Sequence, residues 1–155
     1  DYGEICGDCF SEYDECAGLI KNWKGYVLPN ILSLPDLPVE KTERAVFTLI
    51  YMSRIHPKKN LEVVFRAISK LSMNVLLKVA GAGDSAYVDS LKALARSLNI
   101  EDKIEWTGWM DRTQKFTALM QADLFILVSR NENFANVVVE SLHMGTPVLI
   151  SREGA

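Results

Sequence analysis

Between residues 45 and 151, short apolar runs alternate with segments in which apolar residues recur at helical spacing. The runs predict strands, and the helical spacing predicts amphipathic helices. Strands are expected at 45–52, 74–81, 103–108, 123–129 and 147–151, and helices at about 60–71, from 85 onward, at 111–122 and at 134–144. Apolar strands joined by helices form a parallel sheet that is covered on both faces. The sequence therefore predicts a doubly wound α/β domain, in which ligands bind beyond the carboxyl ends of the strands.

The expected helices have recognisable starts and buried faces. Asp84 and Asp111 each precede a helical segment, and an aspartate there accepts hydrogen bonds from the first N–H groups of the helix. The buried positions are expected to be Leu61, Val64, Phe65, Ile68 and Leu71 in the first helix, Tyr87, Leu91, Leu94, Ala95 and Leu98 in the second, and Phe134, Val137, Val138 and Leu142 in the last. Another face of the last helix would then carry Asn136, Glu140 and His143.

The first 44 residues have a different character. Residues 9–23 are weakly helical in pattern, and prolines interrupt the acidic segment at 32–43, which is typical of a linker. We therefore divide the chain into an N-terminal helix and interdomain-linker-like segment at 1–44 and a domain at 45–155. With 155 residues, of which 48% are hydrophobic, the chain is long enough for one globular domain with a core.

Charge and the length of the apolar runs exclude several classes of protein. The net charge is -3 and the 17 Lys and Arg residues are scattered, so the chain offers no basic surface for nucleic acid. The longest strongly apolar run, 45–52, is too short to cross a bilayer, and the N-terminus is acidic where a signal peptide is basic. We expect a soluble chain in a reducing, cytoplasmic compartment.

Three cysteines, Cys6, Cys9 and Cys16, lie near the N-terminus. The first two have the spacing of a zinc or redox pair, but a structural zinc site usually has four ligands, and no nearby histidine or further cysteine supplies the fourth. The odd number of cysteines argues against a disulfide framework. We expect no metal site.

The first strand-to-helix loop, SRIHPKKN, carries Arg54 at the end of the strand and Lys59 just before the helix. Two cations beside a helix N-terminus, with its outward N–H groups, make an anion site suited to a diphosphate. The alternative is a polar turn with solvated charges.

The next two loops carry fewer cations. The glycines of AGAGD could form a dinucleotide-binding turn, but the third glycine of that pattern is absent and the helix begins with an acidic residue, so a tight turn is favoured. The third loop places Trp109 and Met110 at a strand end, where they could wall a base pocket. Trp109 could equally pack in the core.

The fourth loop and its helix contain two glutamates eight positions apart. Glu132 precedes the helix and Glu140 lies about a turn inside it, so the pair brackets the helix N-terminus. One carboxylate could face a ligand near the loop while the other accepts hydrogen bonds from a diol, with phosphates between them on the helix N–H groups. In the alternative, both carboxylates are solvated and the helix dipole stabilises Glu132.

Together, SRIHPKKN, AGAGD, WTGWM and SRNENFANVVVESLHMGTPVLIS resemble the C-terminal, donor-binding domain of retaining GT-B glycosyltransferases of family 4. The resemblance covers residues 24–155, and its strongest motifs are the Arg and Lys of the first loop and the glutamate pair. It implies the C-terminal half of a GT-B fold, a Rossmann-like doubly wound parallel sheet, truncated at its C-terminus.

The resemblance also implies roles for individual residues. Arg54 and Lys59 would bind the diphosphate of a nucleotide sugar, the substrate, so that no metal or other cofactor is required. Glu132, as the catalytic residue, would contact the sugar and support its transfer, and Glu140 would bind the ribose hydroxyls. The other donor-binding positions would be Met110, whose side chain or backbone would lie beside the base, and Phe134, Ala135 and Asn136.

Two positions depart from the family pattern, because family members usually have glycine at Ala135 and often at Asn60. The family also has an N-terminal domain that holds the sugar or lipid-linked acceptor, and this chain has no counterpart of it. We therefore expect a donor half that is inactive alone and belongs to a cytoplasmic enzyme which could be peripheral to the membrane. An open sheet edge could pair with a second copy. The alternative is a non-catalytic α/β interaction module derived from such a domain.

Overall fold

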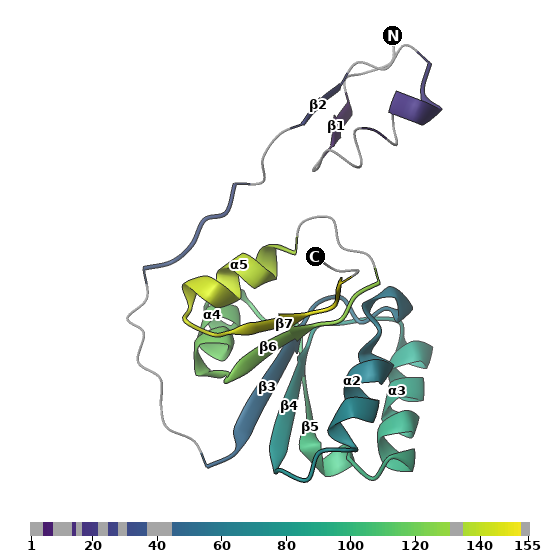
Figure 1. The fold of residues 1–155 in the computed structure, drawn as a ribbon, viewed down its shortest axis with the longest axis vertical. Coiled ribbons are helices and arrows are strands. Elements are labelled where there is room, and N and C mark those ends of the chain that lie inside the picture. Colours follow the sequence, from purple (N-terminus) through teal and green to yellow (C-terminus); the bar gives the residue numbers. More distant parts are fainter. Residues whose placement is uncertain are drawn as a thin grey trace.

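The central element of the structure is a parallel sheet with the strand order β5-β4-β3-β6-β7 (Figure 1). The computed structural model describes residues 5–7, 14, 17–21, 25–27, 31–36, 45–130 and 135–152. The strands of this sheet are β3 (Phe47–Met52), β4 (Val75–Ala80), β5 (Ile104–Gly108), β6 (Leu124–Leu127) and β7 (Val148–Ile150). A separate parallel pair joins β1 (Ile5–Gly7) to β2 (Gly25–Val27). The parallel sheet predicted from the sequence is confirmed.

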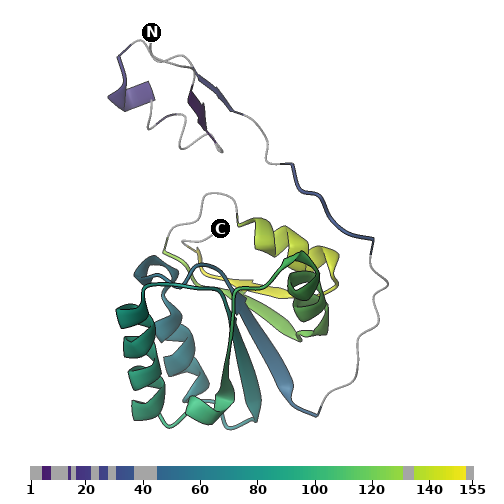
Figure 2. The same cartoon turned by 180° about the vertical axis from the view of Figure 1, so that it is seen from behind.

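Helices cover both faces of the sheet. The α-helices are α2 (Leu61–Ile68), α3 (Ser85–Ser97), α4 (Arg112–Gln121) and α5 (Asn136–His143), and the 3-10 helices are η1 (Pro57–Lys59) and η2 (Glu101–Lys103). Helices α2 and α3 lie together on one side and α4 and α5 on the other (Figure 1 and Figure 2). The side chains of β3 alternate accordingly, since Tyr51 packs in the cluster under α2 and α3 and Ile50 in the cluster under α4.

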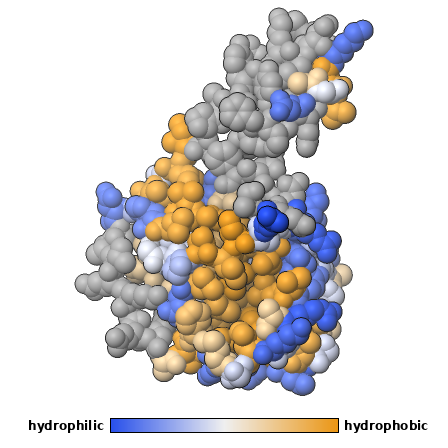
Figure 3. All heavy atoms as spheres, in the orientation of Figure 1, coloured by the Kyte–Doolittle hydropathy of each residue, from blue (hydrophilic) through white to orange (hydrophobic). Residues whose placement is uncertain are grey.

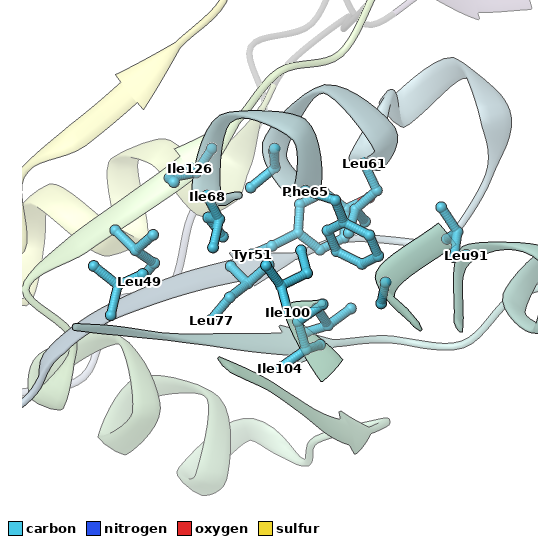
Figure 4. Close-up of a cluster of buried hydrophobic side chains, with 14 of the residues drawn as sticks. Leu49, Tyr51, Leu61, Phe65, Ile68, Leu77, Leu91, Ile100, Ile104 and Ile126 are labelled. Atoms are coloured by element: carbon cyan, nitrogen blue, oxygen red, sulfur yellow. The ribbon is translucent and has the colours of Figure 1, made fainter. Parts of the chain in front are cut away.

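The larger core cluster lies between the sheet and helices α2 and α3. Figure 4 shows Leu61, Phe65 and Ile68 of α2 turned toward the strands. Phe65 is fully buried and forms a T-shaped pair with Trp106 on β5, with ring centroids 6.1 Å apart. The predicted stripe was wrong at Leu71, which is 41% exposed. Helix α2 ends at Ile68, and the Leu71 N–H donates to the Ile68 carbonyl in a turn that takes Leu71 off the helix face.

Helices α3 and α4 begin where the sequence predicts. The Asp84 carboxylate accepts a hydrogen bond from the Tyr87 N–H at 3.0 Å, and the Asp111 carboxylate accepts one from the Gln114 N–H at 2.8 Å. The Gln114 side chain in turn accepts from the Asp111 N–H at 3.0 Å, which completes a capping box. Both starts are fixed by residues within one turn of each other, and such local signals can be recognised in a sequence.

The buried face of α5 differs from the predicted one. Leu142, expected in the buried stripe, is 56% exposed, whereas Ser141 is fully buried. Val137 and Val138 pack against the second core cluster, as predicted. The Ser141 hydroxyl donates to a backbone carbonyl at 3.1 Å, so a small, satisfied polar side chain takes the place expected for a leucine. The helix is rotated relative to the prediction, and Glu140 lies next to its buried face.

The loop between β4 and α3 packs closely against the loop that follows β3. A Cβ atom at Gly81 would lie 2.0 Å from the Ser53 carbonyl oxygen, and one at Gly83 would lie 2.1 Å from the Ile55 carbonyl oxygen. Gly81 also has a φ of 138°, a conformation that other residues rarely adopt. The glycines are therefore required by backbone packing, in agreement with the tight turn favoured by the sequence.

The segment 31–36 is held by helices α4 and α5. A guanidinium nitrogen of Arg112 donates to the Ser33 carbonyl at 2.6 Å, and His143 Nε2 lies 2.9 Å from the Pro35 carbonyl oxygen. Because a carbonyl oxygen only accepts, His143 Nε2 carries the proton in this contact. His143 is exposed, as predicted for a helix-surface residue, and it also fixes this segment.

Part of the sheet is less well covered on the side of α2 and α3. Figure 3 shows a broad apolar area in the view of Figure 1, around the position of β6 and β7. Leu149 of β7 is 52% exposed and Val63 of α2 is 48% exposed. Among the described strands, β7 pairs only with β6, and pairing of its other edge with a second copy stays a prediction. None of the helices in the described ranges is long and apolar enough to cross a membrane.

Candidate functional site

A cleft of about 530 Å³ opens where strands β3, β4 and β5 end, and the first turns of α4 and α5 complete its walls. Its position follows the rule that open parallel sheets bind ligands beyond the carboxyl ends of their strands, and its size is typical of small-molecule sites. Within the described part of the chain, its lining residues are Met52, Ser53, Arg54, Ala80, Gly81, Trp109, Met110, Asp111, Arg112, Lys115, Asn136, Val137 and Glu140. Four of the predicted site residues, from three different loops and helices, therefore share one cleft.

Arg54 is exposed on the cleft wall, just beyond the end of β3. Its backbone is fixed, because the buried Tyr51 donates its hydroxyl proton to the Arg54 carbonyl at 3.2 Å and the neighbouring Ser53 N–H donates to the Ala80 carbonyl at 3.2 Å. A guanidinium on a fixed backbone presents a planar pair of donors that suits phosphate oxygens.

Lys59 ends the short helix η1 and is half-buried. The start of η1 is capped by His56, whose Nδ1 accepts from the Lys58 N–H at 3.1 Å. Asn60 then adopts a left-handed φ of 57°, and α2 begins at the next residue. Of the described residues, Lys59 is not one that lines the cleft, so its place beside Arg54 at a diphosphate stays a prediction.

Glu140 is almost buried, with only 8% of its surface exposed, and it lines the cleft from α5. Its Oε1 lies 2.5 Å from Nζ of Lys115, which reaches it from α4. The alternative in which Glu140 is a solvated surface carboxylate is therefore wrong. Sequence analysis missed Lys115 because the two residues lie 25 positions apart on different helices. In the sequence, the only sign of Lys115 is a positively charged residue one turn after Asp111, which caps α4.

The third loop forms the apolar side of the cleft. Trp109 lines it and is 80% exposed, so the alternative in which Trp109 packs in the core is wrong. Met110 lies beside it, and Asp111, which caps α4, follows. An exposed indole next to a methionine offers an apolar surface on which a planar ring can stack.

The fourth loop is described only in part. Glu132 and Phe134 lie outside the described residues. Ala135 immediately precedes α5 and has a left-handed φ of 31°, and Asn136, the first residue of α5, lines the cleft. Ala135 and Asn60 stand where the family pattern has glycine, and both have positive φ, which glycine adopts without steric cost.

The described residues include no group of three or more His, Cys, Asp or Glu side chains placed to hold a metal ion. Cys9 and Cys16 lie outside the described residues, and of Cys6 only the backbone, in β1, is described. The charged side chains that line the described cleft include Arg54, Lys115 and Glu140.

Comparison with known proteins decides the family of this chain. The family model for glycosyl transferases group 1 matches residues 38–155. The chain belongs to the glycosyl transferases group 1 family. This group 1 glycosyltransferase chain is 35% identical over 103 residues to the alpha-monoglucosyldiacylglycerol synthase of Streptococcus pneumoniae, a match that covers 66% of this chain and 23% of that protein. It is 33% identical over 120 residues to the D-inositol 3-phosphate glycosyltransferase of Mycolicibacterium smegmatis, covering 72% of this chain and 28% of that protein.

The fold is also that of solved GT-B glycosyltransferases. The group 1 chain superposes on the Anabaena protein HepE, solved in complex with UDP and glucose, with a TM-score of 0.76. The match covers 96% of this chain and 44% of HepE, at 19% identity, so it shows the fold alone. The chain spans about a quarter of the length of the curated relatives that it matches. The activities named for those relatives belong to longer proteins.

Proposed function

We propose that this chain is the C-terminal, donor-binding domain of a retaining family 4 glycosyltransferase, and that it binds a nucleoside diphosphate sugar in the cleft. The observation that carries the proposal is the meeting of Arg54 and Glu140 in one cleft at the carboxyl edge of the sheet. A nucleotide sugar needs a cation for its diphosphate and an acceptor for its ribose hydroxyls. The exposed Trp109, which lines the same cleft, supplies an apolar surface for the base.

Each part of the donor has a proposed partner. Arg54 and Lys59 bind the diphosphate, together with the N–H groups at the start of α5 near Ala135 and Asn136. Glu140 accepts hydrogen bonds from the ribose hydroxyls, since each carboxylate oxygen has two lone pairs and only Oε1 accepts from Lys115. Met110 and Phe134 contact the donor beside these groups, and Glu132 acts on the sugar, both as the family resemblance implies. The diphosphate charge is met by these groups without a metal ion.

The transfer itself needs an acceptor, and we propose that a second domain of the whole enzyme holds it. Positioning an acceptor against the donor supplies roughly 7 to 11 kcal/mol of a reaction barrier, and excluding water strengthens the charges in the cleft. We therefore expect the 155-residue chain to bind a donor but to transfer no sugar at an ordinary enzymatic rate. The names of the relatives and the UDP and glucose in HepE support a nucleotide-sugar donor.

The test is calorimetric titration of the purified chain with UDP, GDP and ADP, with and without their attached sugars. Saturable binding of one nucleotide, weakened in the Glu140→Gln variant with an unchanged melting temperature, would support the donor site. Ribose recognition predicts that the 2′,3′-dideoxy form of that nucleotide binds the parent poorly and is little affected by Glu140→Gln. Absence of binding for all three nucleotides would favour a non-catalytic α/β interaction module.

A further inference from the structure

We propose that Lys115 is a positioning residue for Glu140, and that through Glu140 it makes the cleft select ribonucleotides over deoxyribonucleotides. The inference rests on the proposed donor site and adds to it a residue that ribose recognition would require. Lys115 lies on α4, and no motif in the sequence connects it with the glutamate pair.

The two side chains meet on the wall of the cleft. Lys115 Nζ and Glu140 Oε1 are 2.5 Å apart, and both residues line the cleft. The side chain of Lys115 keeps 27% of its surface exposed and that of Glu140 keeps 11%. The pair is therefore neither a surface ion pair nor sealed in the core, and a ligand in the cleft can reach it.

Lys115 is itself held in place. Its ammonium nitrogen lies 4.8 Å from the ring centroid of Phe116, which is 1% exposed. An ammonium over the face of a buried ring gains a cation–π attraction. The other cation that α4 presents to the cleft, Arg112, donates to the carbonyl of Ser33 at 2.6 Å. Lys115 thus pairs with the Glu140 carboxylate, and its contact with Phe116 restricts the position of its ammonium group.

The consequence concerns the second carboxylate oxygen. A carboxylate with little exposure loses hydration, and an ion pair with a nearby cation compensates for that loss. With Oε1 bound to Lys115, the rotation of the carboxylate is fixed and Oε2 remains as an acceptor. A vicinal diol presents two hydroxyl donors, so a fixed, charged acceptor distinguishes ribose from a sugar that lacks one or both hydroxyls.

Two variants of Lys115 and one control test this role. Lys115→Met removes the charge and keeps most of the length of the side chain, and Lys115→Arg keeps the charge. Lys92→Met is the control, because Lys92 also pairs with a carboxylate, that of Asp89 at 4.0 Å, and also lies over a ring, that of Trp106 at 5.9 Å, but does not line the cleft. Melting temperatures are recorded for each variant.

The ligands are the best-binding nucleotide among UDP, GDP and ADP and its 2′,3′-dideoxy form, measured by calorimetric titration. Lys115→Met should weaken binding of the ribonucleotide about tenfold, as expected for loss of one charge-assisted contact. Binding of the dideoxy form should weaken less than about twofold. Lys115→Arg should bind the ribonucleotide with most of the affinity of the parent. Lys92→Met should bind both ligands as the parent does. In the double variant with Glu140→Gln, the Lys115 substitution should add nothing to the loss caused by Glu140→Gln alone.

If Lys115→Met weakened the binding of both ligands equally, the inference would be overturned, because Lys115 would then act on the phosphates, the base or the fold. Additive losses in the double variant would overturn it as well. Should Lys115→Met fail to fold, Lys115→Gln is measured in its place and judged by the same outcomes. If the parent binds none of the nucleotides, the proposed donor site fails and this inference fails with it. If the parent binds them with a preference for ribose that Lys115→Met leaves intact, only this inference fails.

Discussion

Two helices begin at the same edge of the sheet in different ways, α3 after β4 and α5 after β6. The loop from β4 to α3 contains glycines that lie against the backbone of the β3 loop, and Asp84 caps the helix that follows. The helix after β6 is preceded by Ala135, which is left-handed and has no side-chain group that could cap α5. The Asp84 side chain thus satisfies the start of α3, whereas Ala135 contributes no side-chain hydrogen bond to the start of α5.

The difference separates two requirements for glycine. At Gly83 the requirement is space, because a Cβ atom would lie 2.1 Å from a backbone oxygen, and no other residue can meet it. At Ala135 the requirement is only a positive φ of 31°, which a non-glycine residue can adopt at a cost of about 1 kcal/mol or somewhat more. Backbone packing therefore excludes a side chain at Gly83. The position of Ala135 tolerates a side chain, and the loop after β4 borders the same cleft through Gly81.

Gly83→Ala should have the largest effect, because the added Cβ meets the Ile55 carbonyl, which is backbone and cannot move alone. We expect the free energy of unfolding to fall by about 3 kcal/mol, at the upper end of the usual cost of overpacking. Urea denaturation of the variant measures this. Gly18→Ala is the matched control, since nothing lies within 4 Å of a Cβ there. If Gly83→Ala were as stable as Gly18→Ala, the requirement for space at Gly83 would be wrong.

Arg54→Ala tests whether the cleft beside the start of α5 binds an anion. We expect binding of the preferred nucleoside diphosphate to weaken by roughly 1.5 to 3 kcal/mol, because charge-assisted hydrogen bonds to a dianion are lost. Titration calorimetry gives the affinity, and Arg66→Ala on α2 serves as control, because Arg66 is exposed and is not a lining residue of the described cleft. Parent-like binding by Arg54→Ala would mean that the phosphates lie elsewhere.

Asp84→Ala removes the cap of α3 without touching the cleft. The loss of one capping bond should lower the free energy of unfolding by about 1 kcal/mol, and nucleotide affinity should not change. Chemical denaturation and titration of the same preparation test both parts. A fall in affinity with unchanged stability would show that Asp84 itself takes part in binding, beyond its role as the cap of α3.

Ala135→Gly should have the smallest effect and the opposite sign. Glycine relieves the left-handed conformation but loses more conformational freedom on folding, so we expect a net gain of about 0.5 kcal/mol in the free energy of unfolding. The same change at Ala93, an exposed position inside α3, should cost about 1 kcal/mol. Destabilisation by Ala135→Gly would contradict the left-handed assignment.

Local signals in the sequence determined the order of the elements and the starts of α3 and α4. Alternating strands and helices specify a parallel sheet, and Asp84 and Asp111 act on N–H groups only three residues away. The same logic placed Arg54 and Met110 at the cleft, because residues that follow parallel strands meet at one edge of the sheet.

Only the tertiary structure decided how α5 is rotated and what Glu140 contacts. Three consecutive valines and a leucine give this helix several apolar stripes of similar quality, so periodicity could not show that Leu142 is exposed and Ser141 buried. The choice was made by packing against the sheet and against α4, and it brought Glu140 to Lys115 across two helices. Such a pair depends on the relative rotation and distance of elements far apart in the chain, which no short-range pattern in a single sequence contains.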